Sequence, residues 1–333
     1  MLTPNKAAVV PRLAGIGPDS RQNVGMLRRS WLLVILVLVG CTSEGGTNGR
    51  LAVSSDLDGD WDLVVVDLAS SMARKITDNM AYDWGPVFSA DGNRIMYASD
   101  YDAGVIQDLI IYDDDGVPSQ VVKERTRDRN IFSIGSDGSK SVRLTENPAT
   151  DDQPAWSSDG HHIAFVSDRT GDVEIFSMDS GGENTVQLTD TPGNDWNPEW
   201  SPNGDQIAFA SDRTGNWEIY VMDADGTNVR QFSDSPGDNQ GPAWSPNGDQ
   251  IAFGSNRTGD FEIYVKNLQS GEMQQLTDSP GTDFEPVWSP DGSMIAFASA
   301  RAGPLEVFLM SADGENPTPI KLRGIPSSWV KGS

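Results

Sequence analysis

The sequence predicts an all-β protein, a six-bladed β-propeller whose blades are four-stranded antiparallel sheets. The first observation is a repeat, because tryptophans recur every 44 residues, at Trp156, Trp200, Trp244 and Trp288. The second is the content of each repeat, which holds several short strand-like runs separated by Gly, Pro, Asn and Asp. A period of about 40–45 residues with several short strands is typical of a propeller blade. The third is that no apolar pattern with a helical period occurs after residue 41.

The repeat at 195–238 shows all four strands of a blade. Residues 206–211 form an apolar run suited to a buried strand, and residues 218–222 are rich in β-branched and aromatic types. The run 198–201 opens the unit, and the weaker, more polar run 229–232 suits an outer edge. Turn residues between these runs favour tight hairpins, so the four strands should pair in chain order.

The four repeated tryptophans are interpreted as packing residues. A large aromatic side chain on the innermost strand can pack against the next blade, and its burial stabilises the fold by about 2–3 kcal/mol. The alternative is that these side chains contact a ligand.

The remaining blades follow the same landmarks. Four units open at prolines 44 residues apart, and a further unit begins within residues 84–92. The earliest unit starts at its second strand, with residues 51–56, and lacks an inner strand. Residues 325–329 match in part the Pro-x-Trp opening of the other units. We therefore predict that the ring is closed between the N- and C-terminal strands, which ties down both chain ends.

One unit is longer than the others. It exceeds the 44-residue repeat by 24 residues, and the surplus lies in residues 101–128. Because the third-strand pattern occurs twice, at 108–116 and at 130–138, we predict an extra hairpin inside one blade. A degenerate seventh blade is the alternative. The predicted propeller domain covers residues 50–333.

Composition argues against several kinds of function. The chain has 333 residues, a formal net charge of -25, one cysteine and two histidines. A single cysteine rules out an intramolecular disulfide and a cysteine-cluster metal site. The negative charge disfavours nucleic acid, whose phosphates would be repelled, and equally disfavours broad adhesion to anionic lipid. We expect a monomer without a cofactor.

The first 40 residues are predicted to be a leader and not part of the fold. Two arginines precede an apolar run over residues 31–40, which is too short to span a bilayer and has the length of a secretory signal. Met26 could be the true start of the protein. Residues 1–25 would then be an over-extended start, and residues 26–40 the signal peptide.

The segment Leu38-Val39-Gly40-Cys41 resembles the bacterial lipoprotein box. The resemblance implies cleavage before Cys41 and lipidation of that residue, the only cysteine in the chain. Residues 41–49 would form a Gly/Ser/Thr-rich tether. By resemblance to bacterial lipoprotein sorting, Thr42 implies the outer membrane over the inner one, with the propeller on the periplasmic side. The alternative is an ordinary signal peptide or anchor with an incidental cysteine.

The repeated motif Pro-x-Trp-Ser-Pro-Asp/Asn-Gly, followed by Ile-Ala-Phe-x-Ser and Arg-x-Gly-x-x-Glu-Ile-Tyr, resembles the TolB-type propeller repeat, a WD-like class. The resemblance covers about residues 50–325. It implies the fold much more firmly than the function, because one fold hosts many functions. TolB itself carries an α/β domain before its propeller. Since the repeats begin within ten residues of Cys41, we expect this chain to lack that domain.

One face of the predicted ring gathers charged residues. The loops between second and third strands share this face with the connections between blades. A ring of donors and acceptors around the channel mouth could grip a peptide or an acidic group through arginine. The alternative is a repeated Asp–Arg or Arg–Glu brace between neighbouring blades. The candidate binding residues on this face are Asp168, Arg169, Asp212, Arg213, Asn256, Arg257 and Arg301.

The sequence offers little for catalysis, and we predict no catalytic and no metal-binding residue. His161 and His162 are adjacent and are expected in an exposed turn. The chain has no Gly-x-Ser-x-Gly elbow, and two adjacent histidines cannot build the histidine-rich metal centre that similar propeller lyases use. Residues 56–62 suggest a calcium loop, but Trp61 stands where an EF-type loop requires Gly.

We therefore expect a lipid-anchored cell-envelope propeller that is a binding platform for a protein or peptide. Its membrane contact would be the lipid on Cys41 only, and we expect no nucleic-acid partner. One alternative is a propeller enzyme, a lyase or a glycoside hydrolase, that uses carboxylates at the channel mouth. The other is a purely architectural element of an envelope complex.

Overall fold

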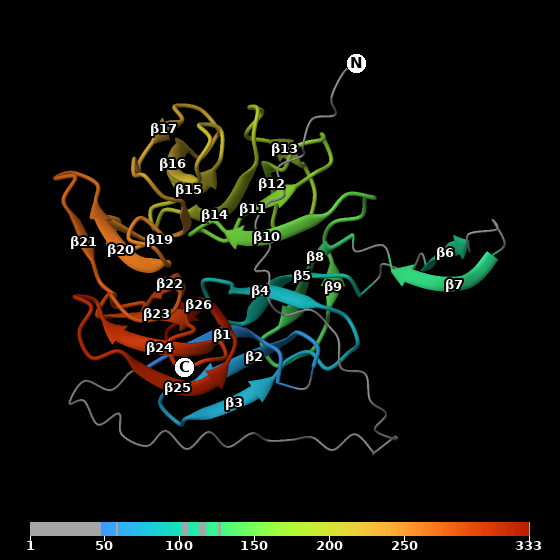
Figure 1. The fold of residues 1–333 in the computed structure, drawn as a ribbon, viewed down its shortest axis with the longest axis horizontal. Helices are drawn as coiled ribbons and strands as arrows, with labels where there is room; N and C mark the ends of the chain where they lie inside the picture. The colour runs from blue at the N-terminus through green and yellow to red at the C-terminus, as the bar shows by residue number, and fades with distance from the viewer. Residues whose placement is uncertain (1–47, 58, 102–105, 113–117, 126–127, 333) are drawn as a thin grey trace. The chain divides into compact units, whose positions relative to one another are not determined.

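Six four-stranded antiparallel sheets are arranged around a common axis in the part of the chain that the structure describes (Figure 1). The structure is a computed structural model and describes residues 48–332, apart from 58, 102–105, 113–117 and 126–127. From the innermost strand outwards, the blades are β26 (Ile325–Val330), β1 (Arg50–Ser55), β2 (Asp62–Asp67) and β3 (Met72–Lys75); β4 (Asp83–Phe88), β5 (Arg94–Ser99), β8 (Asn130–Gly135) and β9 (Val142–Arg143); β10 (Asp151–Trp156), β11 (His162–Ser167), β12 (Glu174–Asp179) and β13 (Val186–Gln187); β14 (Asp195–Trp200), β15 (Gln206–Ser211), β16 (Glu218–Asp223) and β17 (Arg230–Gln231); β18 (Asn239–Trp244), β19 (Gln250–Ser255), β20 (Glu262–Asn267) and β21 (Met273–Gln275); and β22 (Asp283–Trp288), β23 (Met294–Ser299), β24 (Glu306–Ser311) and β25 (Thr318–Arg323).

The prediction of six four-stranded blades is confirmed, and so is the closure of the ring. The C-terminal strand β26 pairs antiparallel with β1, with Leu51 opposite Trp329. The blade that begins with the N-terminal strands therefore receives its innermost strand from the other end of the chain. A closed ring leaves no long sheet edge open for pairing with other molecules.

The longer unit does not form a seventh blade. Strand β5 pairs directly with β8, so these two are the second and third strands of one blade. Between them in sequence, β6 (Ile106–Tyr112) and β7 (Pro118–Arg125) pair with each other in a separate two-stranded sheet.

The innermost strands carry a bulge that turns one residue towards the axis. In five blades the ladder register shifts at this point, and the bulged residue has a left-handed backbone with φ between 49° and 62°. A proline follows directly, and since proline has no N–H to donate, it suits a break in the ladder. The five bulged residues are Gly85, Gln153, Asn197, Gly241 and Glu285.

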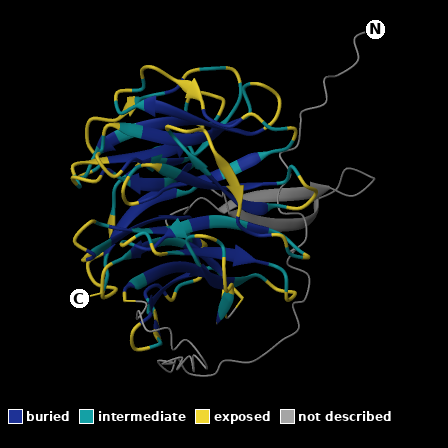
Figure 2. Cartoon of the chain, turned by 90° about the vertical axis from the view of Figure 1, so that its left-hand side faces the viewer, coloured by how far each residue is buried: buried dark blue, intermediate teal, exposed yellow. Residues whose placement is uncertain are grey.

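The core lies between adjacent blades. Strands are mostly buried, while the connecting turns carry most of the exposed residues (Figure 2). Trp200 is 8% exposed and packs in one cluster with Ala155 and Ile175 of the preceding blade. Trp244 and Trp288 do the same in their own clusters, and each indole N–H also donates to a backbone carbonyl of the preceding innermost strand, at 3.2 and 3.1 Å. Trp156 is only partly buried and packs against the cluster that contains Met96.

The predicted leader, residues 1–40, and the lipidation site Cys41 lie outside the described residues. Within the described part of the chain, no helix has the length and apolar character needed to cross a membrane.

Candidate functional site

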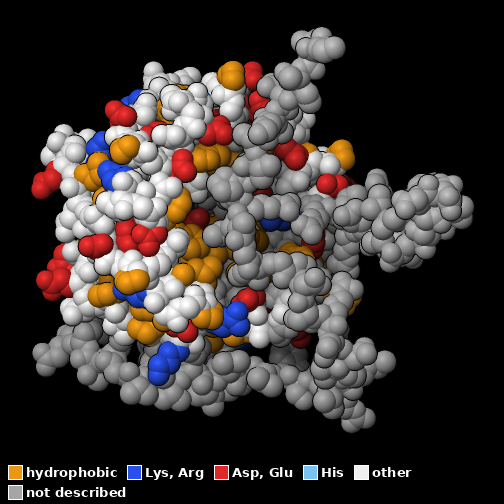
Figure 3. All heavy atoms as spheres, in the orientation of Figure 1, with side chains coloured by type: hydrophobic (Ala, Val, Ile, Leu, Met, Phe, Trp, Pro, Cys, Tyr) orange, Lys and Arg blue, Asp and Glu red, His pale blue; other side chains and the backbone are white. Residues whose placement is uncertain are grey.

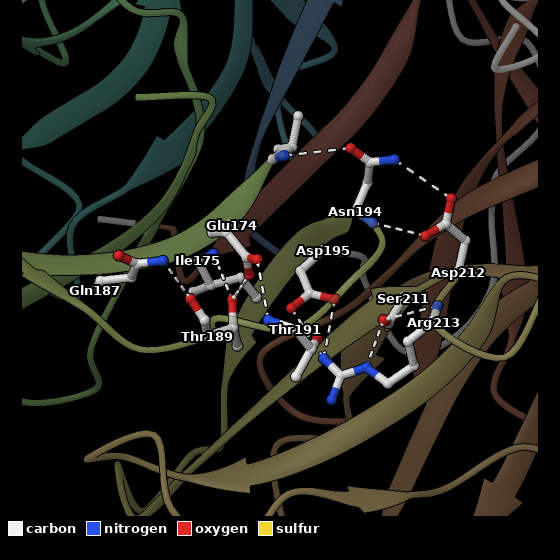
Figure 4. Close-up of polar contacts among 11 residues, drawn as sticks. Glu174, Ile175, Gln187, Thr189, Thr191, Asn194, Asp195, Ser211, Asp212 and Arg213 are labelled. Atoms are coloured by element: carbon white, nitrogen blue, oxygen red, sulfur yellow. Dashed lines mark hydrogen bonds and ion pairs between the residues drawn. The ribbon is translucent and has the colours of Figure 1, made fainter. Parts of the chain in front are cut away.

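The predicted arginines are engaged within their own blades. Arg213 donates from Nη2 to both carboxylate oxygens of Asp195, at 3.0 and 2.9 Å, and from Nε to Ser211 Oγ at 2.7 Å (Figure 4). Its guanidinium also stacks on two rings, with its central carbon 4.6 Å from the Tyr220 centroid and 5.3 Å from that of Phe209. Only 15% of the Arg213 side chain remains exposed. The guanidinium therefore ties the first strand of the blade to the second and third.

The other three predicted arginines repeat this arrangement, each stacked on two aromatic rings and bonded to a serine of the second strand. These contacts lie inside a blade, whereas the brace considered from the sequence joined neighbouring blades. In each arginine Nε and Nη2 are both occupied, which favours a structural role over capture of a ligand. From Nη2, Arg169 donates to Asp151 at 2.7 Å, Arg257 to Asn239 at 2.9 Å, and Arg301 to Asp283 at 2.6 Å.

The acidic and amide residues before these arginines hold the connections between blades. Each accepts a backbone N–H from the connection that leads into its own blade. Such bonds fix the loop and leave little freedom for ligand binding. The pairs are Asp168 with Thr150 at 2.9 Å, Asp212 with Asn194 at 2.6 Å, and Asn256 with Asp238 at 2.7 Å.

Carboxylates of the third strands link one blade to the next. Glu174 accepts bonds from Thr189 Oγ1 at 2.5 Å and from the Thr191 backbone at 3.2 Å (Figure 4). Burial and, to a smaller extent, the neighbouring carboxylate of Asp195 together raise the pKa of Glu174 to about 7, although the hydrogen bonds from Thr189 and Thr191 lower it. In the next blade Glu218 meets Asn239 instead, whose Nδ2 donates to it at 2.8 Å. The two junctions are therefore equivalent, except that Glu174 faces a second carboxylate, Asp195, and Glu218 faces the amide of Asn239.

A cavity of about 290 Å³ occupies the middle of the ring. All six innermost strands line it, and the five bulged residues are among the lining side chains and backbones. The space-filling view shows hydrophobic side chains gathered around this central region (Figure 3). Its lining is polar and apolar in about equal parts, and the polar part includes the carboxylates of Glu199 and Glu285.

Two glutamates of this cavity are the functional candidates that the sequence did not reveal. Burial raises the pKa of Glu199 to about 8, with a smaller contribution from the charge of Glu285, and burial raises the pKa of Glu285 to about 7. No hydrogen bond or ion pair to either carboxylate is formed by the residues that the structure describes. Each side chain keeps part of its surface open to the channel. They are therefore the unpaired acidic groups at the centre of the molecule.

A bulge explains how the Glu285 side chain reaches the cavity. A Cβ placed on Gly241 would lie 3.3 Å from the Glu285 carboxyl group, so that side chain extends over the neighbouring innermost strand. Gln153 extends in the same manner and accepts the Asn197 backbone N–H at 2.7 Å. One signal was available in the sequence. Four other units carry Val or Ala at the position of Glu199 and the closing strand carries Ser328, so its carboxylate is the exception among the repeats.

A comparison with protein families agrees with the propeller fold. The TolB β-propeller domain family, PD40, matches residues 170–235 and 229–330. The chain carries a TolB-like β-propeller domain. A comparison with curated proteins finds no match.

Solved structures show the same fold as this TolB-like propeller at low sequence identity. TolB from Acinetobacter baumannii superimposes with a TM-score of 0.69 at 19% identity, over 86% of this chain and 67% of that one. A putative TolB from Agrobacterium tumefaciens gives 0.63 at 21% identity, over 84% and 92% of the two chains. An oligogalacturonate lyase in complex with manganese gives 0.54 at 16% identity, over 81% and 73%. At such identities the likeness concerns the fold alone.

The remaining candidates of the TolB-like propeller lie on its surface turns. His161 and His162 are exposed, and His162 Nδ1 lies 3.6 Å from Asp179. In the segment considered for calcium, Asp56 pairs with Arg323 at 3.2 Å. Across the described residues, no group of three or more His, Cys, Asp or Glu side chains is arranged to hold a metal ion.

Proposed function

We propose that this protein is a lipid-anchored cell-envelope propeller that binds a protein or peptide, and that a cationic group of the ligand enters the central channel. The observation that carries this proposal is the pair Glu199 and Glu285, two carboxylates in one cavity without a partner among the described residues. A buried carboxylate without a partner favours its neutral form, and a nearby cation favours its charged form. A lysine, an arginine or an N-terminal amine would supply that cation.

The size of the cavity supports a side chain as the occupant. Its volume of about 290 Å³ is at the lower limit of the sites that take small molecules, roughly 300–1,000 Å³. One long basic side chain fits such a space, while the rest of the ligand remains outside on the face of the ring. The chain's net charge of -25 attracts a basic partner over longer distances.

The lipid anchor is proposed from the sequence. Cys41 follows a short apolar segment and stands in a lipoprotein-box pattern, so it would be the lipidated first residue of the mature protein. The propeller would then sit on the periplasmic side of the outer membrane. Mass spectrometry of the N-terminal peptide tests this, and a Cys41→Ser variant should leave the membrane fraction. An unmodified cysteine in the mature protein would contradict the anchor.

A second candidate function is that of an enzyme, because glycoside hydrolases also use two carboxylates in one cavity as their catalytic pair. Glu199, with its pKa of about 8, suits a general acid. Its partner would have to be ionised to act as base or nucleophile, but burial raises the pKa of Glu285 to about 7 as well. The platform is therefore our first proposal. Turnover of a polysaccharide that disappears in Glu199→Gln would favour the enzyme.

Affinity capture from a cell-envelope extract tests the platform. The bait is the full chain in detergent, compared with a Glu199→Gln/Glu285→Gln variant, which keeps the side-chain shape and removes both acids. A Glu183→Gln/Glu315→Gln variant, altered at two exposed glutamates, is the matched charge control. We expect a partner that the parent and the control retain and the channel variant loses. Equal capture by all three would refute a channel-centred platform.

A further inference from the structure

Four aromatic residues lie at the strand ends and connections where blades β26-β1-β2-β3 and β4-β5-β8-β9 meet. The rings of Trp61 and Trp84 meet edge to face, with centroids 4.7 Å apart. Tyr82 is separated from Trp84 by one residue, and its backbone N–H donates to the side chain of Asp100, the residue before Tyr101, at 2.8 Å. We call Trp61, Tyr82, Trp84 and Tyr101 the aromatic strip.

The two tyrosines of the strip replace polar residues that four other blades have at the same positions, whereas the positions of Trp61 and Trp84 are aromatic in other blades too, for example at Trp217 and Trp196. Tyr101 occupies the place of the bracing arginines, for example Arg213, and Tyr82 the place of Thr150. Both tyrosines extend into solvent, with 49% of Tyr82 and 63% of Tyr101 exposed. Since four other units manage the fold with polar residues here, folding does not require the tyrosines. Exposed Tyr and Trp side chains are the residues most enriched where binding energy concentrates.

The strip leads into the channel. Trp84 lines the central cavity that holds Glu199 and Glu285, while Tyr82 and Tyr101 lie further out. One end of the strip therefore lines the same cavity as the two unpartnered carboxylates. This combination distinguishes between occupants, because a second copy of this acidic chain would bring like charge, and a neutral sugar would leave the carboxylates without a cation.

We infer that the aromatic strip binds an apolar side chain of the same peptide whose basic residue enters the channel. The inference rests on the proposed function and adds to it the chemistry of the ligand: a basic residue with a large apolar or aromatic residue a few positions away. Charge complementarity selects the basic residue and the strip selects the apolar one.

Selection from a random heptapeptide phage library tests the inference with the full chain as bait. We expect peptides that combine Lys or Arg with an aromatic or large aliphatic residue to be enriched at least tenfold. A Tyr82→Thr/Tyr101→Ser variant should lose the apolar preference, to below twofold, and keep the basic one. A Glu199→Gln/Glu285→Gln variant should lose the basic preference. A Val186→Thr/Val229→Thr variant, altered at exposed apolar residues of outer strands, should behave as the parent.

The outcomes separate the inference from the proposed function. Enrichment of basic residues alone, unaffected by the tyrosine substitutions, would overturn the role of the strip and leave the channel site standing. Enrichment of neither type by the parent would overturn both. Because both tyrosines are exposed, thermal unfolding of the variant should match that of the parent, and a lower midpoint would show that the strip is structural instead.

Discussion

The junction between blades β10–β13 and β14–β17 gives a prediction with its own internal control. Replacing Glu174 with Gln keeps an acceptor for the Thr189 hydroxyl or the Thr191 backbone and provides an N–H for the neighbouring Asp195. It removes one of two adjacent carboxylates, which are kept apart from water. We therefore expect Glu174→Gln to raise the free energy of unfolding at alkaline pH.

The size and the pH window follow from the pKa. The pKa of Glu174 is raised from 4.5 to about 7, and each unit corresponds to about 1.4 kcal/mol. The full shift would amount to about 3 kcal/mol, and because Glu174 and Asp195 share it, we expect about 1.5–2 kcal/mol. Because the pKa of Glu174 is raised in the folded protein, this group stabilises the fold fully below its unfolded value of 4.5, and that stability is lost as the pH rises through 7. The advantage of Glu174→Gln should therefore be near zero at pH 4 and complete at pH 8.

Urea unfolding of the parent and the variant at pH 4 and pH 8 measures this difference. Glu218→Gln is the control, because Asn239 already donates an amide N–H to Glu218 at 2.8 Å. There the substitution weakens charge-assisted hydrogen bonds and should lower the free energy of unfolding by about 1–2 kcal/mol at pH 8. If both variants change stability in the same direction, or if the Glu174→Gln effect does not depend on pH, the reasoning about paired carboxylates is wrong.

Three further predictions concern the channel, the core and the arginine brace. Binding of a lysine-containing peptide, followed by calorimetry, should tighten between pH 6 and pH 9, because Glu199 and Glu285 must lose protons with pKa values of about 8 and about 7 to hold a cation; constant affinity over this range would speak against a carboxylate site. Trp200→Ala should lower the free energy of unfolding in urea by about 3–5 kcal/mol, since it empties a packed cluster between two blades; a loss below about 1 kcal/mol would mean that Trp200 does not support the interface. Arg213→Ala should cost about 3 kcal/mol by the same measurement, because Asp195 would remain buried with its bidentate partner gone; Asp195→Asn in the same chain should recover part of that loss.

The fold could be predicted because its determinants are local and repeated. The Pro-x-Trp opening, the apolar second strand and the Glu-Ile-Tyr third strand recur every 44 residues, so periodicity specifies the strand order of each blade. Even the closing strand was visible, since Trp329 keeps the place of the repeated tryptophans and pairs opposite Leu51. The position of Cys41 and its modification remain predictions from the sequence.

The site was harder to predict, because its residues are exceptions to the repeat. Glu199 stands where four other units carry Val or Ala and the closing strand carries Ser. A bulge directs Glu285 to the axis, and an alternating strand pattern does not predict such a bulge. The arginines were identified from the sequence as candidate binding residues, but in the structure they are engaged within their own blades. Arg213 follows Asp195 by 18 residues, and Arg301 follows Asp283 by the same interval. This constant spacing indicates a pairing within each blade.

The pairing of β26 with β1 also determines how the ring bears mechanical load. Strand β1 begins at Arg50, close to the N-terminal end of the described chain, and is held between β26 and β2. If the protein is tethered through its N-terminus, tension from the membrane arrives at this strand first. The hydrogen bonds of β1 with its two neighbours then resist the pull, and the other five blades remain unloaded until that blade opens. With such a tether, the load would enter at the blade that closes the ring, so the sheet that completes the circle would also be the first to yield under force.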